Sequence, residues 1–132
     1  MPHRNETMLR DLYAAAAAAE GDVERLRQLI HPDIVWHVPG RNALTGEYKG
    51  IDEVLGLFGR LASLTDGTFG SELHDVVAGE EHVVGLHVEH GERAGRSLDA
   101  RLALIGHVRE GRLVEVWEGH TDAEAYDAFW SA

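Results

Sequence analysis

The chain has 132 residues, of which 44% are hydrophobic, and it carries a net charge of −11 with its histidines neutral. This length fits one domain over residues 1–132 with a substantial core, and the negative surface argues against nucleic acid and anionic membranes as partners. The absence of cysteine excludes disulfides and thiolate chemistry, and because the longest apolar run, residues 14–19, cannot span a bilayer, we expect a soluble cytoplasmic protein.

Residues 7–20 are the first predicted helix. Its inward stripe is Met8, Leu12, Ala15, Ala16 and Ala19, and its alanine run has the best intrinsic helix propensity. Gly21 ends this helix, and Asp22 is expected to cap a second short helix over residues 23–30. The segment His31-Pro32-Asp33 closes the second helix, because the residue before a proline is disfavoured in the helical region.

A strand, a loop and a third helix are expected next. Residues 34–38 predict a short strand, and residues 45–50 (TGEYKG) a loop or a short extended piece. Residues 51–64 carry apolar side chains at helical spacing. Asp52 and Glu53 lie in the first turn of this helix, where the helix dipole favours negative charge.

After residue 67 the apolar period changes from helical to alternating. Four strands are predicted, over residues 69–78, 82–90, 97–109 and 113–120. The breaks between them, residues 79–81, 91–95 and 110–112, have hairpin character, with Gly111 suited to a positive φ. Consecutive strands on short turns must pair antiparallel.

The chain ends in a predicted helix. Thr121-Asp122-Ala123-Glu124 matches a capping box with Thr121 as the N-cap, and Ala125, Tyr126, Phe129 and Trp130 form the inner face. The expected fold class is therefore α+β, with helices on one face of an antiparallel sheet. A strongly twisted sheet can curl around its helices and leave a blind cavity between the two layers.

Four segments carry a resemblance to a known family. The runs HPDIVWHVPG, TGEYKGIDEVLGLF and VREGRLVEVWEGHTD, with the DAFW ending, resemble the nuclear transport factor 2-like superfamily. Within it, they are most similar to the SnoaL-like polyketide cyclase and ketosteroid isomerase-related group, over residues 8–130. The resemblance implies a conical, barrel-like α+β fold with a central cavity. It leaves the activity open, because this scaffold carries cyclases, isomerases, hydrolases, dehydratases and non-catalytic binders.

The resemblance singles out Glu118. SnoaL-like cyclases hold a catalytic aspartate on the last strand, seven residues after the glycine of the preceding hairpin, and this count from Gly111 reaches Glu118. The two carboxyl groups of a ketosteroid isomerase would fall at Val38 and near Leu104, which are both apolar. The tyrosine on the first helix of that isomerase corresponds to Tyr13, within one residue. The resemblance therefore implies a mechanism other than that of ketosteroid isomerase.

Strand alternation gives Glu118 its expected surroundings. Val116, Glu118 and His120 share one face of the last strand, which Leu102 and Leu104 face from the neighbouring strand. Apolar surroundings disfavour the charged form of a carboxylate, which suits proton transfer. We expect Glu118, with His120 as its partner, to abstract a proton α to a carbonyl, followed by ring closure or double-bond migration. The alternative is a Glu118 that pairs with an arginine or a backbone donor inside a ligand-free cavity.

Further residues are candidates for binding a small hydrophobic molecule. Trp36 is expected to reach the cavity from the first strand, and Tyr13, Tyr48 and Phe58 to close its mouth. For each aromatic residue, packing in the core is the simpler alternative. Asp122 is a weaker candidate, because capping the last helix would account for it.

No metal site and no cofactor are expected. His87 and His90 lie three apart, which in a strand places them on opposite faces, so they cannot bind one metal ion together. The outward sheet face mixes polar groups with Ile105 and Trp117. An exposed tryptophan on a sheet suggests a covered surface, and we expect a homodimer through this face.

Two hypotheses about function remain. The first is a cofactor-free enzyme that acts on a hydrophobic carbonyl compound, with Glu118 as the acid/base. The second is a non-catalytic protein that holds an apolar ligand in the same cavity, or an accessory subunit of a larger enzyme. An epoxide hydrolase is a further alternative, although the aspartate–arginine–aspartate arrangement of that class is not evident in the sequence.

Overall fold

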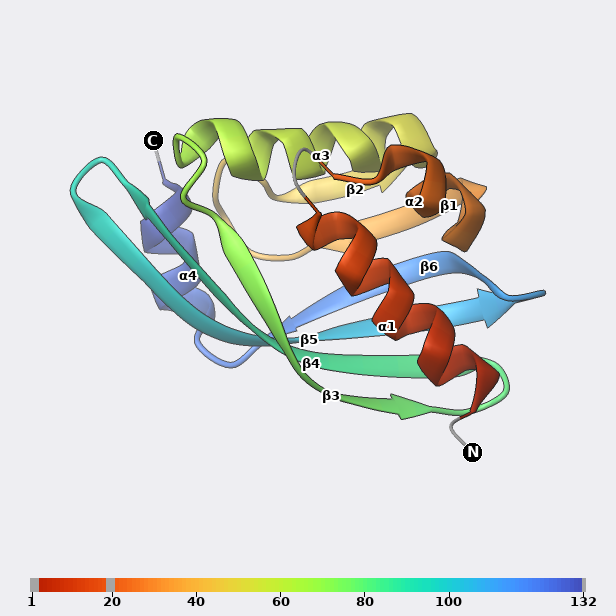
Figure 1. Cartoon of the computed structure of the whole chain (residues 1–132). Coiled ribbons are helices and arrows are strands. Elements are labelled where there is room, and N and C mark those ends of the chain that lie inside the picture. Colours follow the sequence, from red (N-terminus) through yellow and green to blue (C-terminus); the bar gives the residue numbers. More distant parts are fainter. Residues whose placement is uncertain (1–2, 19–20, 132) are drawn as a thin grey trace.

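Helices cover one face of a curved sheet in this chain. The computed structural model describes residues 3–18 and 21–131. Within these residues the elements are α1 (Arg4–Ala17), α2 (Val23–Leu29), β1 (Ile30–Val38), β2 (Gly46–Lys49), α3 (Ile51–Leu64), β3 (Gly70–Ala78), β4 (His82–Arg93), β5 (Arg96–Arg109), β6 (Arg112–His120) and α4 (Ala123–Trp130). Figure 1 shows α1, α2 and α3 on the same side of the sheet, with α4 at one end. This arrangement confirms the predicted α+β cone.

The sheet has the strand order β2-β1-β6-β5-β4-β3. Strands β3 to β6 form an antiparallel meander, as predicted from their short turns. Strand β1 pairs antiparallel with β2 but parallel with β6, so the sheet is mixed. Trp36 of β1 thereby lies opposite Val116 of β6, two residues before Glu118. The parallel pair therefore brings the first and the last strand of the chain together.

The N-terminal helix is shifted relative to its prediction. Helix α1 begins at Arg4, where His3 is the N-cap and its side chain accepts from the Asn5 N–H, and it ends at Ala17 rather than at residue 20. Ala19, predicted on its inward stripe, lies outside the described residues. Asp22 caps α2 as predicted, by accepting from the Arg25 N–H.

Strand β1 is longer than predicted. It begins at Ile30, directly after α2, and the segment His31-Pro32-Asp33 belongs to it rather than closing a helix. The register with β6 is irregular between residues 30 and 35. Pro32 lies in this irregular stretch, where its missing N–H removes no regular ladder hydrogen bond.

The hairpin between β4 and β5 is tighter than predicted. The expected break at residues 91–95 shrinks to Ala94 and Gly95, because β4 continues to Arg93. Both turn residues have positive φ, 51° and 76°, as a two-residue hairpin turn of the favoured hand requires. Glu110 and Gly111 repeat this geometry between β5 and β6, which confirms the positive φ predicted for Gly111.

Helix α4 is capped by Asp122, not by Thr121 as predicted. The Asp122 carboxylate accepts from the Ala125 N–H at 3.0 Å. The Thr121 hydroxyl donates instead to the carbonyl of Arg101 on β5, at 2.9 Å. Thr121 therefore links the end of β6 to the neighbouring strand, and Asp122, the next residue with a side-chain oxygen, caps the helix.

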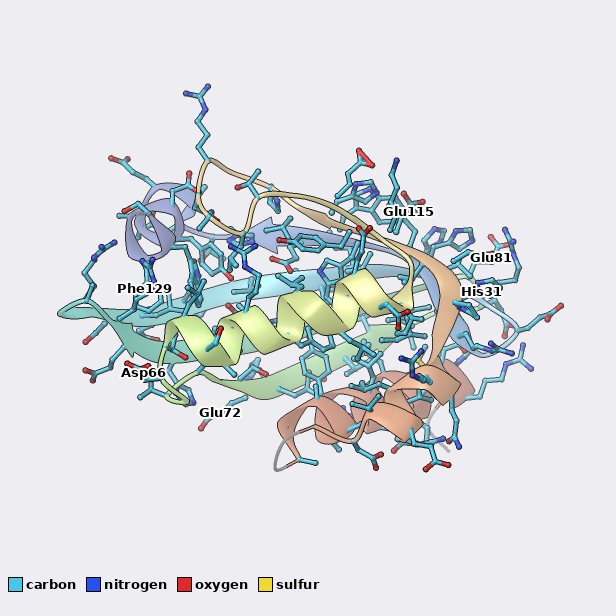
Figure 2. All side chains as sticks on the ribbon, turned by 90° about the horizontal axis from the view of Figure 1, so that it is seen from above. His31, Asp66, Glu72, Glu81, Glu115 and Phe129 are labelled. Atoms are coloured by element: carbon cyan, nitrogen blue, oxygen red, sulfur yellow. The ribbon has the colours of Figure 1, made fainter. Side chains whose placement is uncertain are left out.

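Contacts with β4 and with the loop after β1 hold α4 in place. The Arg93 guanidinium donates to the carbonyls of Phe129 and Ser131, at 3.1 and 2.6 Å. Oδ1 of Asp127 accepts from the Arg41 N–H and from the Asn42 side chain, at 2.9 and 2.7 Å, and these bonds lower the pKa of Asp127. Figure 2 shows Phe129 at the same end of the molecule as Asp66 and Glu72, with His31 and Glu81 at the other.

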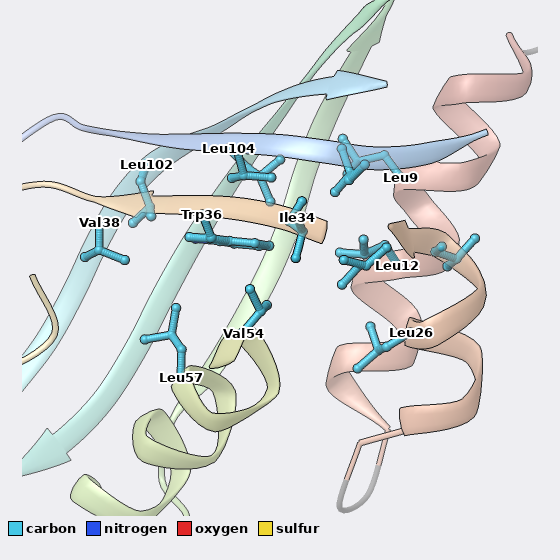
Figure 3. Close-up of a cluster of buried hydrophobic side chains, with 14 of the residues drawn as sticks. Leu9, Leu12, Leu26, Ile34, Trp36, Val38, Val54, Leu57, Leu102 and Leu104 are labelled. Carbon is cyan, nitrogen blue, oxygen red and sulfur yellow. The ribbon is translucent and has the colours of Figure 1, made fainter. Parts of the chain in front are cut away.

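The core lies between the sheet and the helices. Leu12 of α1, Leu26 of α2 and Val54 of α3 are buried, and so are Trp36 of β1 and Leu104 of β5. Figure 3 shows Trp36 between β1 and the α3 side chains Val54 and Leu57. Of the helices in the described ranges, none is long and apolar enough to cross a membrane.

Candidate active site

A cavity of about 850 Å³ lies between the sheet and the helices. Its lining is mostly apolar and includes Leu12, Leu44, Leu55, Phe58, Leu61 and Phe69. Exposed lining residues mark its mouth, among them Ala17 at the end of α1, Gly67 after α3, and Glu72 on β3. The volume suits a drug-sized molecule. Its polar or amphipathic lining side chains include Tyr13, Trp36, His87, Glu89, Glu118 and Tyr126.

Glu118 is held at the cavity wall by two side chains. Its Oε2 accepts from the indole N–H of Trp36 at 2.8 Å, and its Oε1 lies 3.0 Å from Nε2 of His120. Only 12% of the Glu118 side chain and 5% of the His120 side chain are exposed. Among the residues that the structure describes, the carboxylate bonds these two side chains and neither an arginine nor a backbone N–H. It is therefore oriented in an apolar setting, as a positioned base requires.

A second polar cluster on β4 was not predicted. Nε2 of His87 lies 3.0 Å from Oε2 of Glu89, and Nδ1 of His87 lies 2.5 Å from the Tyr13 hydroxyl. The Tyr126 hydroxyl donates to Oε1 of Glu89 at 2.8 Å. His87 and Glu89 are both only 7% exposed. Four side chains from α1, β4 and α4 thus form one buried hydrogen-bonded cluster.

The alternation of β4 contained the signal for this cluster. Residues 83, 85, 87, 89 and 91 of that strand are all buried. His87 and Glu89 therefore continue the inward face that begins with Val83. Buried ionisable groups at positions i and i+2 of an inward strand face mark a candidate site. The sequence analysis considers His87 only as a possible metal ligand together with His90.

Both cluster tyrosines keep their protons. Burial raises the pKa of Tyr13 and of Tyr126 well above the ordinary value of 10.0, and the charges of Glu89 and Glu118 raise both further. Because a phenolate beside two carboxylates is disfavoured, each tyrosine is a neutral hydroxyl at physiological pH. The cavity therefore holds phenolic hydroxyls close to carboxylates.

Gly85 makes room for the ring of Tyr13. A Cβ at this position would lie 2.7 Å from the Tyr13 hydroxyl oxygen and 2.9 Å from Cε2 of the ring. Only a residue without a side chain allows the phenol to pack so closely over β4. The Tyr13–His87 hydrogen bond thus depends on a glycine two residues before the histidine.

The other predicted site residues fall into two groups. Tyr13, Trp36, Phe58 and Leu104 line the cavity with Glu118, and the Trp36 and Phe58 rings meet edge to face, with centroids 5.5 Å apart. The residues outside the lining are Leu102 and Val116, which are buried in the core, His120 behind Glu118, Tyr48, whose hydroxyl donates to the Leu44 carbonyl, and the exposed cap Asp122. The described residues contain no group of three or more potential metal ligands placed to hold an ion.

The outer sheet face presents a row of apolar side chains. Val77, Val84, Ile105 and Trp117 lie opposite one another across β3, β4, β5 and β6. Val77 is 61% exposed, and Ile105 and Trp117 are each 38% exposed. His37 continues the row on β1: its ring stacks on Trp117 and bonds Glu115 at 2.6 Å.

Comparisons with known proteins agree with this architecture. The model of the SnoaL-like domain matches residues 9–116. The uncharacterized protein Rv0034 of Mycobacterium tuberculosis (strain H37Rv) is 36% identical over 117 residues, which cover 88% of this chain and 89% of that protein. The solved structure of Bal32a, from a soil-derived mobile gene cassette, is 33% identical, covers 96% of each chain and has a TM-score of 0.91. IdmH, a proposed polyketide cyclase from Streptomyces antibioticus, is 25% identical with a TM-score of 0.73, over 94% of this chain and 96% of its own.

Proposed function

Because this chain belongs to the SnoaL-like domain family of the nuclear transport factor 2-like superfamily, we propose that it is a cofactor-free acid/base enzyme for a hydrophobic carbonyl compound. Glu118 abstracts a proton from the carbon next to the carbonyl group. The resulting enolate then either attacks a second carbonyl carbon, which closes a ring, or takes a proton at another carbon, which moves a double bond. Family membership supports a cyclase or a small-molecule binder, and the geometry at Glu118 favours the cyclase or isomerase.

The observation that carries this proposal is the placement of Glu118. Its carboxylate lines an apolar cavity, and it is oriented by Trp36 and His120. A carboxylate with a single structural role would be expected to neutralise a cation. Within the described residues, the side chain within salt-bridge distance of Glu118 is His120, an imidazole that is charged only when protonated. This arrangement supports proton transfer at Glu118 over a purely structural ion pair.

IdmH lends support from a relative. It is described as a proposed polyketide cyclase, and it shares 25% of its residues with this chain over nearly the whole of both. Polyketides carry repeated carbonyl groups with acidic neighbouring C–H bonds, which is the chemistry that a buried carboxylate can use. The apolar cavity with its carboxylate supports this substrate class, and the relative is consistent with it.

A non-catalytic binder is the second candidate. The mostly apolar lining of the cavity would hold a hydrophobic ligand without any chemistry. The two candidates differ in one measurable property. A base that takes an α proton and exchanges it with solvent before the proton returns introduces solvent hydrogen at that carbon, whereas a binder does not.

Proton exchange tests the proposed function. Cyclic ketones, aryl ketones and poly-β-carbonyl compounds are incubated with the protein in D₂O, and deuterium uptake at the α carbon is followed by mass spectrometry. The proposal predicts uptake above the buffer rate with at least one class, and loss of that uptake in Glu118→Gln. Saturable binding of these ketones without uptake by the wild type would support the binder instead.

We also propose that the chain forms a homodimer through its outer sheet face. The row of Val77, Ile105 and Trp117 leaves large apolar side chains in water, and a second copy would cover them. Two copies of one face related by a two-fold axis are the commonest way to bury such a surface. The cavity opens on the opposite side of the sheet, so dimerisation leaves its mouth free.

A further inference from the structure

Tyr13, His87 and Glu89 are arranged as an ordered relay. His87 lies between Glu89 and Tyr13, and all three side chains line the cavity. Glu89 and His87 are buried, whereas Tyr13 is the partly exposed member. A buried carboxylate that orients an imidazole, which in turn contacts a hydroxyl, is the logic of an activated hydroxyl in catalytic triads. Here the hydroxyl belongs to a phenol.

The hydrogen-bond directions in this relay follow from Glu89. An ionised carboxylate only accepts hydrogen bonds, so the Tyr126 hydroxyl donates to Oε1 and Nε2 of His87 donates to Oε2. When the ring is neutral, its proton is therefore on Nε2, and Nδ1 accepts from the Tyr13 hydroxyl. The lone pairs of the Tyr13 oxygen are left for a ligand in the cavity. When the ring is protonated, Nδ1 donates to Tyr13 instead, and the Tyr13 hydroxyl hydrogen turns to the ligand.

We propose that Tyr13, His87 and Glu89 form a second acid–base centre that exchanges a proton with a substrate oxygen while Glu118 exchanges one with the adjacent carbon. This inference rests on the proposed function of Glu118 and names its substrate class: a carbonyl compound that passes through an enol. Tyr13 contacts the oxygen directly, His87 holds the exchanged proton, and Glu89 is a positioning residue that fixes the ring.

The protons balance over the two centres. In the direction of the enol, Glu118 takes the α proton, the C–H electron pair forms the new C=C bond, and the carbonyl π pair moves to oxygen. That oxygen takes the Tyr13 proton, and protonated His87 replaces it from Nδ1. The enzyme begins with one proton on His87 and ends with one on Glu118, so its proton count is unchanged. The reverse sequence returns the ketone.

Two further observations support the presence of two acid–base centres in one cavity. Tyr126 bonds Glu89 and also packs against His120, the partner of Glu118, so one side chain borders both centres. Tyr13, Tyr126, Glu89 and Glu118 all line the same cavity. Both centres therefore face the same cavity.

A stable analogue of the enol tests the proposal. 2-Naphthol presents a hydroxyl on an sp² carbon, as an enol does, and naphthalene has the same shape without the hydroxyl. Calorimetric titration of both ligands at pH 7 compares the wild type with Tyr13→Phe, His87→Gln and Glu89→Gln. The matched controls are His82→Gln and Glu92→Gln, which change exposed side chains on the same strand.

The proposal predicts a hydroxyl-specific loss. Tyr13→Phe and His87→Gln weaken 2-naphthol by about tenfold, the size of one hydrogen bond, and leave naphthalene unchanged. Glu89→Gln weakens 2-naphthol by a smaller factor, and the two controls change neither ligand. Tyr13→Phe removes a single oxygen atom, so it tests the proposal even if His87→Gln and Glu89→Gln fail to fold.

Equal weakening of both ligands by Tyr13→Phe, or no effect on 2-naphthol, would overturn the second centre. So would an absence of 2-naphthol binding to the wild type. These outcomes leave α-deuteration of ketones by Glu118 as a separate result. Conversely, hydroxyl-specific binding without any ketone exchange would keep the Tyr13 contact and remove the proposed function.

Discussion

The imidazole of His120 stands edge-on to the phenol ring of Tyr126, with ring centroids 4.0 Å apart and an interplanar angle of 83°. His120 follows Glu118 on β6, whereas Tyr126 on α4 bonds Glu89 of β4. This contact joins the two buried carboxylate centres across the end of the cavity. The docking of a helix of eight residues therefore shapes both centres.

Gly85→Ala should disturb Tyr13 without changing a polar group. The new methyl would lie within 2.7 Å of the Tyr13 hydroxyl oxygen, so the phenol must leave its place beside His87. We expect the affinity for 2-naphthol to fall as it does in Tyr13→Phe, with a loss of about 1–3 kcal/mol in stability from overpacking. Gly119→Ala is the control, because its methyl meets ordinary contacts at 3.8 Å. Unchanged 2-naphthol binding in Gly85→Ala would show that the ring position is not critical.

Tyr126 should make stability depend on alkaline pH. Its pKa is raised in the folded chain, mainly by burial and then by the charge of Glu89, so the unfolded chain loses this proton first as pH rises above the ordinary 10.0. The free energy of unfolding should therefore decline above pH 10. Tyr126→Phe should be less stable by about 1–3 kcal/mol at pH 7, because Glu89 loses a donor, but it should decline less steeply above pH 10. Urea denaturation between pH 7 and 11 measures both, and parallel pH curves would argue against the shift.

Asp127 should stabilise the docking of α4 only above acidic pH. Its pKa is lowered in the folded chain, first by the Arg41 N–H and then by the Asn42 side chain. Its contribution is therefore present above the unfolded value of 3.8 and is lost as pH falls through the lower folded value. Asp127→Ala should melt below the wild type at pH 6, and the gap should close in acid. Asp99→Ala, on the exposed outer face, serves as the control. A gap that persists unchanged at pH 2 would contradict the role of the carboxylate charge.

The outer face should control the oligomeric state. Ile105→Glu and Trp117→Glu place charges in the middle of the exposed apolar row, so we expect a dimeric wild type and monomeric variants in sedimentation velocity. Arg112→Glu changes a charge at the exposed start of β6, the strand that carries Trp117, and this variant should remain dimeric. A monomeric wild type at micromolar concentration would end the proposal of a homodimer through this face.

Periodicity in the sequence predicted most of the fold but only half of the candidate site. The predicted helix over residues 51–64 matches α3 residue by residue, because the apolar side chains keep their helical spacing over this range and Gly50 precedes it as the N-cap. The resemblance to SnoaL-like cyclases implied Glu118, through the count from Gly111. The Tyr13–His87 bond joins residues 74 positions apart, and strand alternation shows that a side chain points inward but not which side chain it will meet. Tyr126 was therefore assigned to the core, and Glu89 was overlooked.

The parallel pairing of β1 with β6 also could not be predicted from the sequence. A short strand next to helices can pair with several strands, and the packing of the whole fold decides that it lies beside the last strand. This pairing brings Trp36 within 2.8 Å of Glu118. The environment of the candidate base is thus set by two strands 82 residues apart in the chain.

Deuterium uptake by Glu118→Gln, measured against Glu115→Gln, tests the central claim most directly. Both variants remove one carboxylate charge from β6, but Glu118 lines the cavity, whereas Glu115 bonds His37 outside the cavity lining. For the ketone that the wild type exchanges fastest, a positioned base predicts a loss of about 10²-fold or more in Glu118→Gln and a near wild-type rate in Glu115→Gln. Equal exchange rates in the wild type and in Glu118→Gln would contradict Glu118 as the base.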